Sequence, residues 1–232
     1  MLSEDDFHAV PRLARVPDAQ REFRDEVVDG LFELTRYVRK LQAALSLFDF
    51  ALSQNLSLPA LPPYDPRRGT DRLSEIKAWQ SSMRDQPFCQ WQLIAVHAGI
   101  FCIDHFLQTM KYIRTSLAQA PALFNRTNQA QLDKAQQIAG ERFPDIPDLR
   151  NAIAHLAELS KNMRAIRTNS FKGPLEDGYF QVAASSAVMV SDYLNGRTFN
   201  TSRNGKLLSF EFSEKSASDT IGIRNEFYAA FN

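Results

Sequence analysis

The sequence predicts a mainly α-helical fold, an up-and-down antiparallel helical bundle with a small C-terminal antiparallel β-meander and a terminal helix. Two observations predict it. Apolar residues recur at helical spacing through much of residues 1–172 of this 232-residue chain. In residues 173–232, strand-like segments are separated by Asn-Gly dipeptides, which two-residue hairpin turns prefer. We therefore expect a bundle and a meander with its helix, packed together as one structural unit.

The first long helix is expected over residues 18–54, where apolar residues alternate at spacings of four and three. Such a seam is suited to lengthwise packing on another helix, and additional apolar residues outside it favour a bundle over an isolated coiled coil. The prolines that follow predict a loop or arm, and helical character resumes near Asp71. The seam consists of Val27, Leu31, Leu34, Val38, Leu41, Leu45, Phe48 and Leu52.

A second long helix is expected over residues 87–119, and because it is apolar nearly all round it should be the central helix of the bundle. Buried polar groups need partners, so its polar stripe must face a cavity, another polar helix face or a dimer contact. In one interpretation Asp104 or His105 orients or supplements a site around His155. The other, a satisfied core network, is favoured because buried polar groups are usually paired structurally. The stripe consists of His97, Asp104, Gln108 and Lys111.

The remaining elements are shorter. A more polar surface helix is expected over residues 126–143, ended by Pro144, and a further helix is expected from Pro147 to about Met163. Ser216 is expected to cap the last helix. The strands of the meander are expected near residues 179–184, 187–194, 197–203 and 206–212.

Composition excludes several classes of protein. Lys+Arg and Asp+Glu are both 27, so a polyanion site must be a local patch. The acidic N-terminus lacks a signal-peptide pattern, and the richest apolar run is too short and too polar for a clean membrane span, so we expect a cytoplasmic protein with no membrane partner. Cys89 and Cys102 would lie roughly 20 Å apart on one helix, beyond disulfide reach. Because phosphate-loop, dinucleotide, nucleophile-elbow and paired-cysteine patterns are absent, we expect no cofactor and no metal.

The segment at residues 148–158, DLRNAIAHLAE, carries the most informative polar residues. On a helix beginning at Pro147, the side chains of Asn151, His155 and Glu158 share one face. Arg150 lies about 140° round the helix, so only its long side chain could let the guanidinium approach the imidazole. An Arg five residues before some His arises by chance in roughly 30% of such sequences, and requiring Asn after the Arg lowers this to roughly 1 to 2%.

These residue types suit phosphodiester chemistry. An arginine can hold the non-bridging oxygens and stabilise developing charge, while a histidine can move a proton to or from a ribose 2′-hydroxyl or a leaving oxygen. No metal is needed for this chemistry. Glu158 is expected to be a second partner of Arg150 or His155, with a simple surface carboxylate as an equal alternative.

Residues 150–155, RNAIAH, resemble the signature of the HEPN superfamily, which is an Arg, a polar residue that is commonly Asn, and a His four to six residues after the Arg. The resemblance covers this motif and the helical region of about residues 18–172, and leaves the strand-rich end unexplained. It implies an up-and-down helical bundle that usually dimerises, so that two copies of the motif form a composite cleft.

Many HEPN domains are metal-independent ribonucleases of toxin, antiviral or RNA-processing systems. The resemblance therefore implies an endoribonuclease in which Arg150 and His155 carry cleavage and Asn151 assists them. It also implies possible partners, a cognate antitoxin or a nucleotidyltransferase. Other HEPN domains are inactive, so the alternative is a non-catalytic nucleotide- or protein-binding module. A third possibility is a nucleotidyl-modifying enzyme or its cognate neutraliser.

A basic segment directly follows the motif. From Leu159 to Leu175 there are four cationic residues and no acidic one, with Phe171 available for base stacking. This segment would suit a single-stranded RNA backbone beside the cleft. The alternative is a solvated helix end, where positive charge is favourable anyway. The expected RNA-binding residues are Lys161, Arg164, Arg167 and Lys172.

Overall fold

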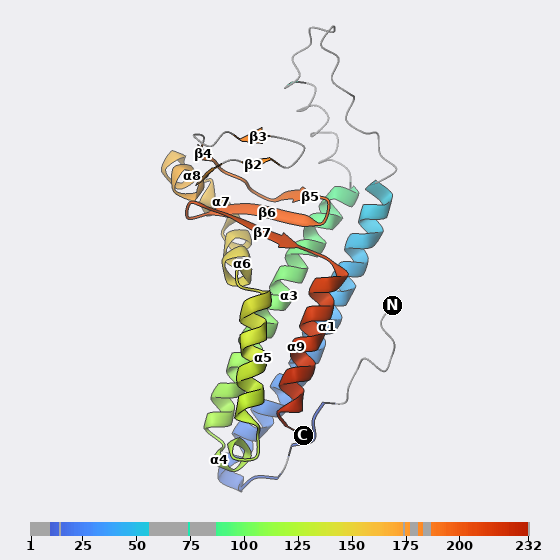
Figure 1. The fold of residues 1–232 in the computed structure, drawn as a ribbon, viewed down its shortest axis with the longest axis vertical. Helices are drawn as coiled ribbons and strands as arrows, with labels where there is room; N and C mark the ends of the chain where they lie inside the picture. The colour runs from blue at the N-terminus through green and yellow to red at the C-terminus, as the bar shows by residue number, and fades with distance from the viewer. Residues whose placement is uncertain are drawn as a thin grey trace.

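The structure is a computed structural model that describes residues 10–13, 15–55, 74, 87–173, 175–176, 181–182 and 187–231. Its long helices run side by side and alternate in direction (Figure 1), which confirms the predicted mainly α fold with an up-and-down bundle. The loop and the helix predicted between residues 56 and 86 fall, apart from Ser74, outside the described residues. The bundle consists of α1 (Arg21–Asn55), α3 (Pro87–Ala118), α5 (Gln129–Arg142) and α9 (Glu214–Ala229).

The α1–α3 pair forms the centre of the core. The predicted seam of α1 is confirmed, because its residues from Val27 to Phe48 are buried and Leu52 is partly buried. The helix α3 is not buried all round, since Trp91 and Ile94 are exposed on one face. The helix is long and apolar enough, by length and composition, to cross a membrane, and half of its most apolar stretch is buried inside the protein.

The terminal helix α9 packs on α5 and α1. Phe227 and Tyr228 on this helix are buried in the core, so the C-terminal region contributes to the same core as the bundle. The predicted cap is wrong by three residues, because α9 begins after Ser213. The side chain of Ser216 completes this cap, since its oxygen accepts a hydrogen bond from the Ser213 N–H at 3.2 Å.

The predicted meander is present as a three-stranded antiparallel sheet in the order β5 (Tyr193–Asn195), β6 (Thr198–Arg203) and β7 (Lys206–Glu211). The second turn is the predicted Asn204-Gly205, with φ values of 50° and 76°, as the two-residue type I′ turn requires. The first turn lies one residue later than predicted. Its central residues are Gly196 and Arg197, because Asn195 pairs with Thr198 and the glycine takes the positive φ of 57°.

The continuous strand predicted over residues 187–194 is wrong. Its first part, β4 (Ala187–Val188), pairs with β1 (Phe171–Lys172), and its last part is β5 in the other sheet. Between them Asp192 has a φ of 49°, a conformation that Asp tolerates better than most residues, and its carboxylate lies 3.1 Å from His97 of α3. A further pair consists of β2 (Leu175–Glu176) and β3 (Gln181–Val182). Of these two strands, β3 lies within the strand predicted over residues 179–184, and β2 was not predicted.

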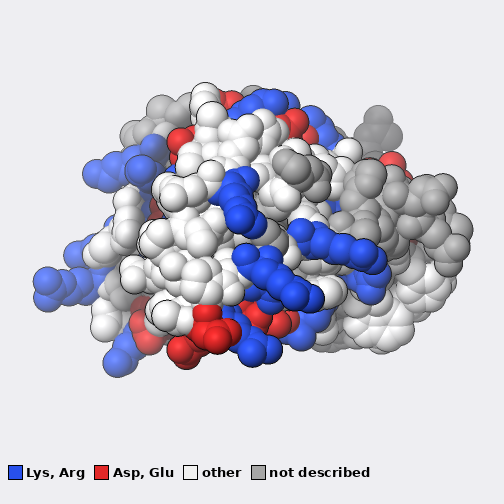
Figure 2. All heavy atoms as spheres, turned by 90° about the horizontal axis from the view of Figure 1, so that it is seen from below, with Lys and Arg blue, Asp and Glu red and all other residues white. Residues whose placement is uncertain are grey.

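Short helices lie at both ends of the bundle. The turn η2 (Asp18–Gln20) precedes α1, and α4 (Pro121–Phe124) joins α3 to α5 at one end of the molecule. Seen from that end, basic and acidic side chains are both present, and some of them lie side by side (Figure 2). Toward the other end, α6 (Ile146–Ala154), α7 (Leu156–Leu159) and α8 (Met163–Asn169) lead from α5 to the sheets (Figure 1).

Candidate functional site

The helix predicted from Pro147 to about residue 163 is interrupted at His155. The helix α6 ends at Ala154 and α7 begins at Leu156, while His155 itself has φ −114° and ψ 23°. Its backbone still joins both helices, because its N–H donates to the carbonyl of Asn151 at 3.1 Å and its carbonyl accepts from the N–H of Glu158 at 2.8 Å. The prediction that one continuous helix carries the motif is therefore wrong.

The imidazole of His155 is half exposed, with 48% of its side-chain surface accessible. Nδ1 lies 3.2 Å from Oε2 of Glu158, the contact that a spacing of three on a helix predicts. Glu158 is itself exposed, so it is both a partner of the histidine and a surface carboxylate. Within the described residues Nε2 has no hydrogen-bond partner. The carboxylate can thus orient the ring while Nε2 stays available to a ligand.

A groove of about 500 Å³ opens beside this histidine. Its volume lies within the range of about 300 to 1,000 Å³ that is typical of small-ligand sites. Three segments form its walls, namely the α7 region, α8 and the turn between β6 and β7. The lining residues are His155, Glu158, Leu159, Asn162, Arg164, Ala165, Thr168, Asn169, Arg203 and Asn204.

The guanidinium of Arg150 points to α3 instead of the imidazole. Nε lies 3.7 Å from Oδ2 of Asp104, the guanidinium carbon lies 5.8 Å from the ring centre of Phe101, and Nη1 donates to Oδ1 of Asn151 at 3.0 Å. The expected approach of Arg150 to His155 is wrong, because no contact between them occurs in the described residues. Arg150 keeps 34% of its side chain exposed and joins α6 to α3.

The two residues expected to support the site on α3 have different surroundings. Asp104 is buried and accepts a hydrogen bond from Gln108 at 2.6 Å in addition to its ion pair with Arg150. Asp104 thus has the partners that a core network requires, but Nε of Arg150 is buried without a hydrogen bond, because 3.7 Å is too long for one. His105 is exposed and stacks on Tyr37 at 5.6 Å between ring centres, so it lies away from the groove.

The basic segment after the motif is divided by the fold. Arg164 lines the groove, whereas the other three cations expected to bind RNA are exposed outside its lining. The expectation that Phe171 is available for stacking is wrong, because only 5% of its surface is exposed. The three cations outside the lining are Lys161, Arg167 and Lys172.

Sequence reasoning missed Arg203, which lies in the opposite wall of the groove. The local sequence does contain one signal, because Arg203 immediately precedes the predicted Asn204-Gly205 turn. That signal locates the turn along the chain. It does not say that the turn packs beside α8, which only the tertiary structure shows.

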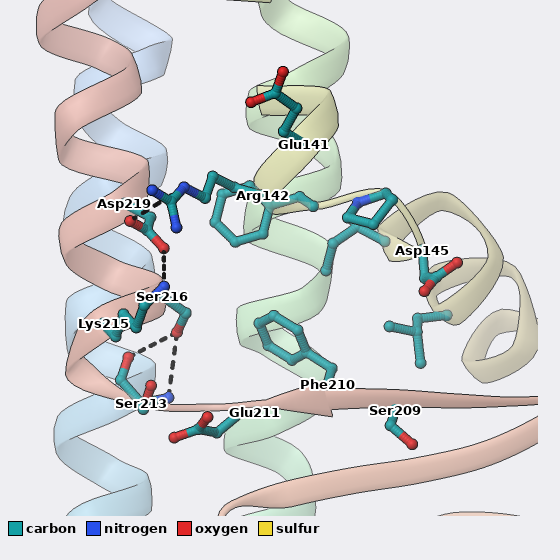
Figure 3. Close-up of a pocket in the computed structure, with 14 residues that line it drawn as sticks. Glu141, Arg142, Asp145, Ser209, Phe210, Glu211, Ser213, Lys215, Ser216 and Asp219 are labelled. Carbon is teal, nitrogen blue, oxygen red and sulfur yellow. Dashed lines mark hydrogen bonds and ion pairs between the residues drawn. The ribbon is translucent and has the colours of Figure 1, made fainter. Parts of the chain in front are cut away.

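A second cavity, of about 340 Å³, lies between the end of α5, the start of α6, β7 and the start of α9 (Figure 3). Its two cations share one carboxylate, since Asp219 lies 2.9 Å from Lys215 and 3.9 Å from Arg142. Three further carboxylates line it, which disfavours a phosphate ligand. These are Glu141, Asp145 and Glu211.

Groups of metal-binding side chains were sought throughout the described residues, and no cluster of three or more His, Cys, Asp or Glu is found there. Neither Cys89 nor Cys102 forms a disulfide. Burial raises the pKa of the Cys102 thiol above its ordinary value, with an opposing contribution from the charge of Lys40. A raised pKa reduces the thiolate fraction, so Cys102 is a poor candidate for a nucleophile or a metal ligand.

Comparisons of this chain with models of protein families, with curated proteins and with solved structures found no match.

Proposed function

We propose that this protein is a metal-independent endoribonuclease of HEPN type in which His155 transfers protons. One observation carries the proposal: a half-exposed imidazole opens into a groove that Arg164 also lines. One ring nitrogen faces the carboxylate of Glu158 and the other is available. A histidine oriented by a carboxylate, beside a permanent positive charge, is suited to proton transfer at a phosphodiester.

In the proposed reaction the ribose 2′-oxygen attacks the adjacent phosphorus. An O–P bond forms to the 2′-oxygen, the P–O5′ bond breaks, and the products are a 2′,3′-cyclic phosphate and a 5′-hydroxyl. His155 accepts the proton of the 2′-hydroxyl, and an acid must deliver a proton to the leaving 5′-oxygen. Arg164 stabilises the negative charge that develops on the phosphoryl oxygens.

Arg150 and Asn151 have a positioning role in this proposal. Arg150 is held by Asp104 and Phe101 and donates to Asn151, while the carbonyl of Asn151 accepts the N–H of His155. This chain of contacts fixes the end of α6, and with it the start of the segment that carries the imidazole. The hydrogen bond from His155 goes to the backbone carbonyl of Asn151 and would survive its replacement, so we expect the larger effect on the orientation of the histidine from replacing Arg150, which joins α6 to α3.

The proposed partner is a second copy of this chain, because a second His155 would supply the acid that the reaction requires. Exposed apolar side chains on α1 and α3 support self-association. Phe50 stacks on Trp91 with 6.2 Å between ring centres, and both are exposed beside Ile94, which has 57% of its surface accessible. Apolar clusters of this kind are typical of protein interaction surfaces.

A second candidate function is a non-catalytic RNA-binding module, and the internal contacts of Arg150 favour it. A guanidinium that pairs with a buried carboxylate can be kept for its structural contribution alone. In that case the groove would bind the RNA backbone and the histidine would transfer no proton.

The test is incubation of the purified protein with labelled single-stranded RNA and with tRNA in EDTA, with sedimentation equilibrium on the same preparation. We expect cleavage products that carry 2′,3′-cyclic phosphate ends, and a dimer. If neither RNA is cleaved although both bind, the non-catalytic module replaces the ribonuclease. A cleaving monomer would remove the second histidine from the proposal.

A further inference from the structure

The groove beside His155 has two walls of different origin. One wall belongs to the helical region and contains Arg164 of α8, and the other is the turn between β6 and β7, which contains Arg203 and Asn204. The strand-rich region therefore contributes directly to the candidate site (Figure 1). The resemblance to HEPN domains gave this region no role.

The turn is held rigidly against α8 by one buried side chain. Asn169 is buried, and its Oδ1 accepts a hydrogen bond from the backbone N–H of Asn204 at 3.2 Å. Its Nδ2 donates to the carbonyl of Ala165 at 2.9 Å. The type I′ conformation of Asn204-Gly205 further restricts the turn. Arg203 is thus presented from a fixed backbone, which reduces the entropy lost when its side chain binds a ligand.

The two arginines of the groove lack neutralising partners. Arg203 makes one long hydrogen bond, 3.4 Å from Nη1 to the backbone carbonyl of Asp148, and within the described residues neither Arg203 nor Arg164 forms an ion pair with a carboxylate. The carboxylate in the lining, Glu158, faces His155. Arg164 and Arg203 outnumber the one carboxylate of the lining, so the lining has a positive formal charge although the chain as a whole has no net charge.

The chemistry of the lining indicates what part of an RNA would be recognised. Guanidiniums bind phosphate oxygens in bidentate geometry, whereas unspecific recognition of bases relies on aromatic stacking. The described lining contains no aromatic side chain apart from the imidazole of His155, and Phe171 is buried in β1. This groove is therefore equipped to bind the sugar–phosphate backbone and, within the described lining, offers no aromatic ring other than the imidazole for stacking on bases.

We infer that Arg203, together with Arg164, binds the backbone phosphates of single-stranded RNA in the His155 groove, so that the β6–β7 turn is one half of the substrate site. The inference rests on the proposed function in one respect only, the identity of the ligand as RNA. It assigns to the C-terminal meander the task of holding the RNA backbone across the histidine.

The test measures binding separately from cleavage. Fluorescence anisotropy with a 2′-O-methyl oligonucleotide, which has no 2′-hydroxyl to attack, compares Arg203→Ala with Lys206→Ala. Lys206 is the matched control because it pairs with Arg203 across the same turn and carries the same charge, but lies outside the lining of the groove. Thermal unfolding of both variants checks that the hairpin is intact.

We expect Arg203→Ala to weaken binding roughly tenfold and to lower the slope of log affinity against log salt by about 0.7, the contribution of one phosphate contact on a single strand. The loss should be similar for oligonucleotides of different sequence, Arg203→Lys should recover part of it, and Lys206→Ala should bind nearly as wild type does. Equal effects of the two alanine variants, or none from Arg203→Ala, overturn the inference. An Arg203→Ala variant that binds normally and cleaves would overturn the inference but not the ribonuclease proposal. A wild-type protein whose binding depends on Arg203 but which does not cleave would overturn the ribonuclease proposal but not the inference.

Discussion

Replacing His155 with glutamine is expected to lower the rate of RNA cleavage at least about 100-fold, the usual contribution of a general base or acid. Glutamine fills similar space and forms hydrogen bonds, but it cannot exchange a proton near neutral pH. His155 is half exposed and its side chain makes one contact, with Glu158, so the substitution should leave the fold and the affinity for RNA nearly unchanged. Single-turnover cleavage in EDTA, with anisotropy on the same variant, measures the two effects separately.

The matched control for this substitution is Arg126→Ala. Arg126 is exposed next to α4, at the end of the bundle away from the groove (Figure 1). The Arg126→Ala variant should therefore cleave RNA at the wild-type rate. Cleavage by His155→Gln within a few-fold of wild type would remove the histidine from the reaction. Loss of RNA binding together with cleavage would instead make His155 a binding residue.

Replacing Gly99 with alanine is expected to cause the largest loss of stability among single-methyl changes of the described glycines. A Cβ at this position would lie 2.3 Å from Cε2 of Phe212, and that ring is buried with its edge against Phe48 at 5.5 Å between centres. Phe212 connects β7 to α9, so the glycine allows the sheet region to approach α3. Overpacking of this kind costs about 1 to 3 kcal/mol.

Gly140→Ala is the matched control for Gly99→Ala. Gly140 lies exposed in α5, and no atom would be within 4 Å of its Cβ. Because alanine favours the helix more than glycine does, this variant should be about 0.5 to 1 kcal/mol more stable than wild type. Urea unfolding of both variants measures the difference. Two shifts of the same sign would show that the contact between Gly99 and Phe212 does not restrict the packing.

The elements that depend on local pattern could be predicted from the sequence. The apolar seam of α1 alternates at spacings that only a helix buries together, and Asn204-Gly205 has the residues that a type I′ turn demands. The failures occur where tertiary contacts decide. Residues 152–157 contain neither glycine nor proline, so nothing local marks the interruption at His155.

The candidate site illustrates the same limit. Helical spacing placed His155 and Glu158 on one face but left Glu158 open between a partner of Arg150 or His155 and a surface carboxylate, and in the structure it lies 3.2 Å from His155. The ion pair of Arg150 with Asp104 joins positions far apart in the chain, and Arg203 reaches the groove through the packing of a hairpin on α8. The sequence singled out His155 and Arg164, but the presence of Arg203 beside them follows from the fold.

Chemical rescue tests the central claim, proton transfer by the imidazole at position 155, most directly. A His155→Gly variant removes the side chain next to a groove that can admit free imidazole. We predict that this variant cleaves labelled single-stranded RNA in EDTA at least about 100-fold more slowly than wild type. Added imidazole should restore cleavage, with a rate that rises with the concentration of its unprotonated form if it acts as the base, or of its protonated form if it acts as the acid. An inactive variant that imidazole does not restore, while it still binds the RNA, would contradict the claim, as would a variant that cleaves at the wild-type rate without imidazole.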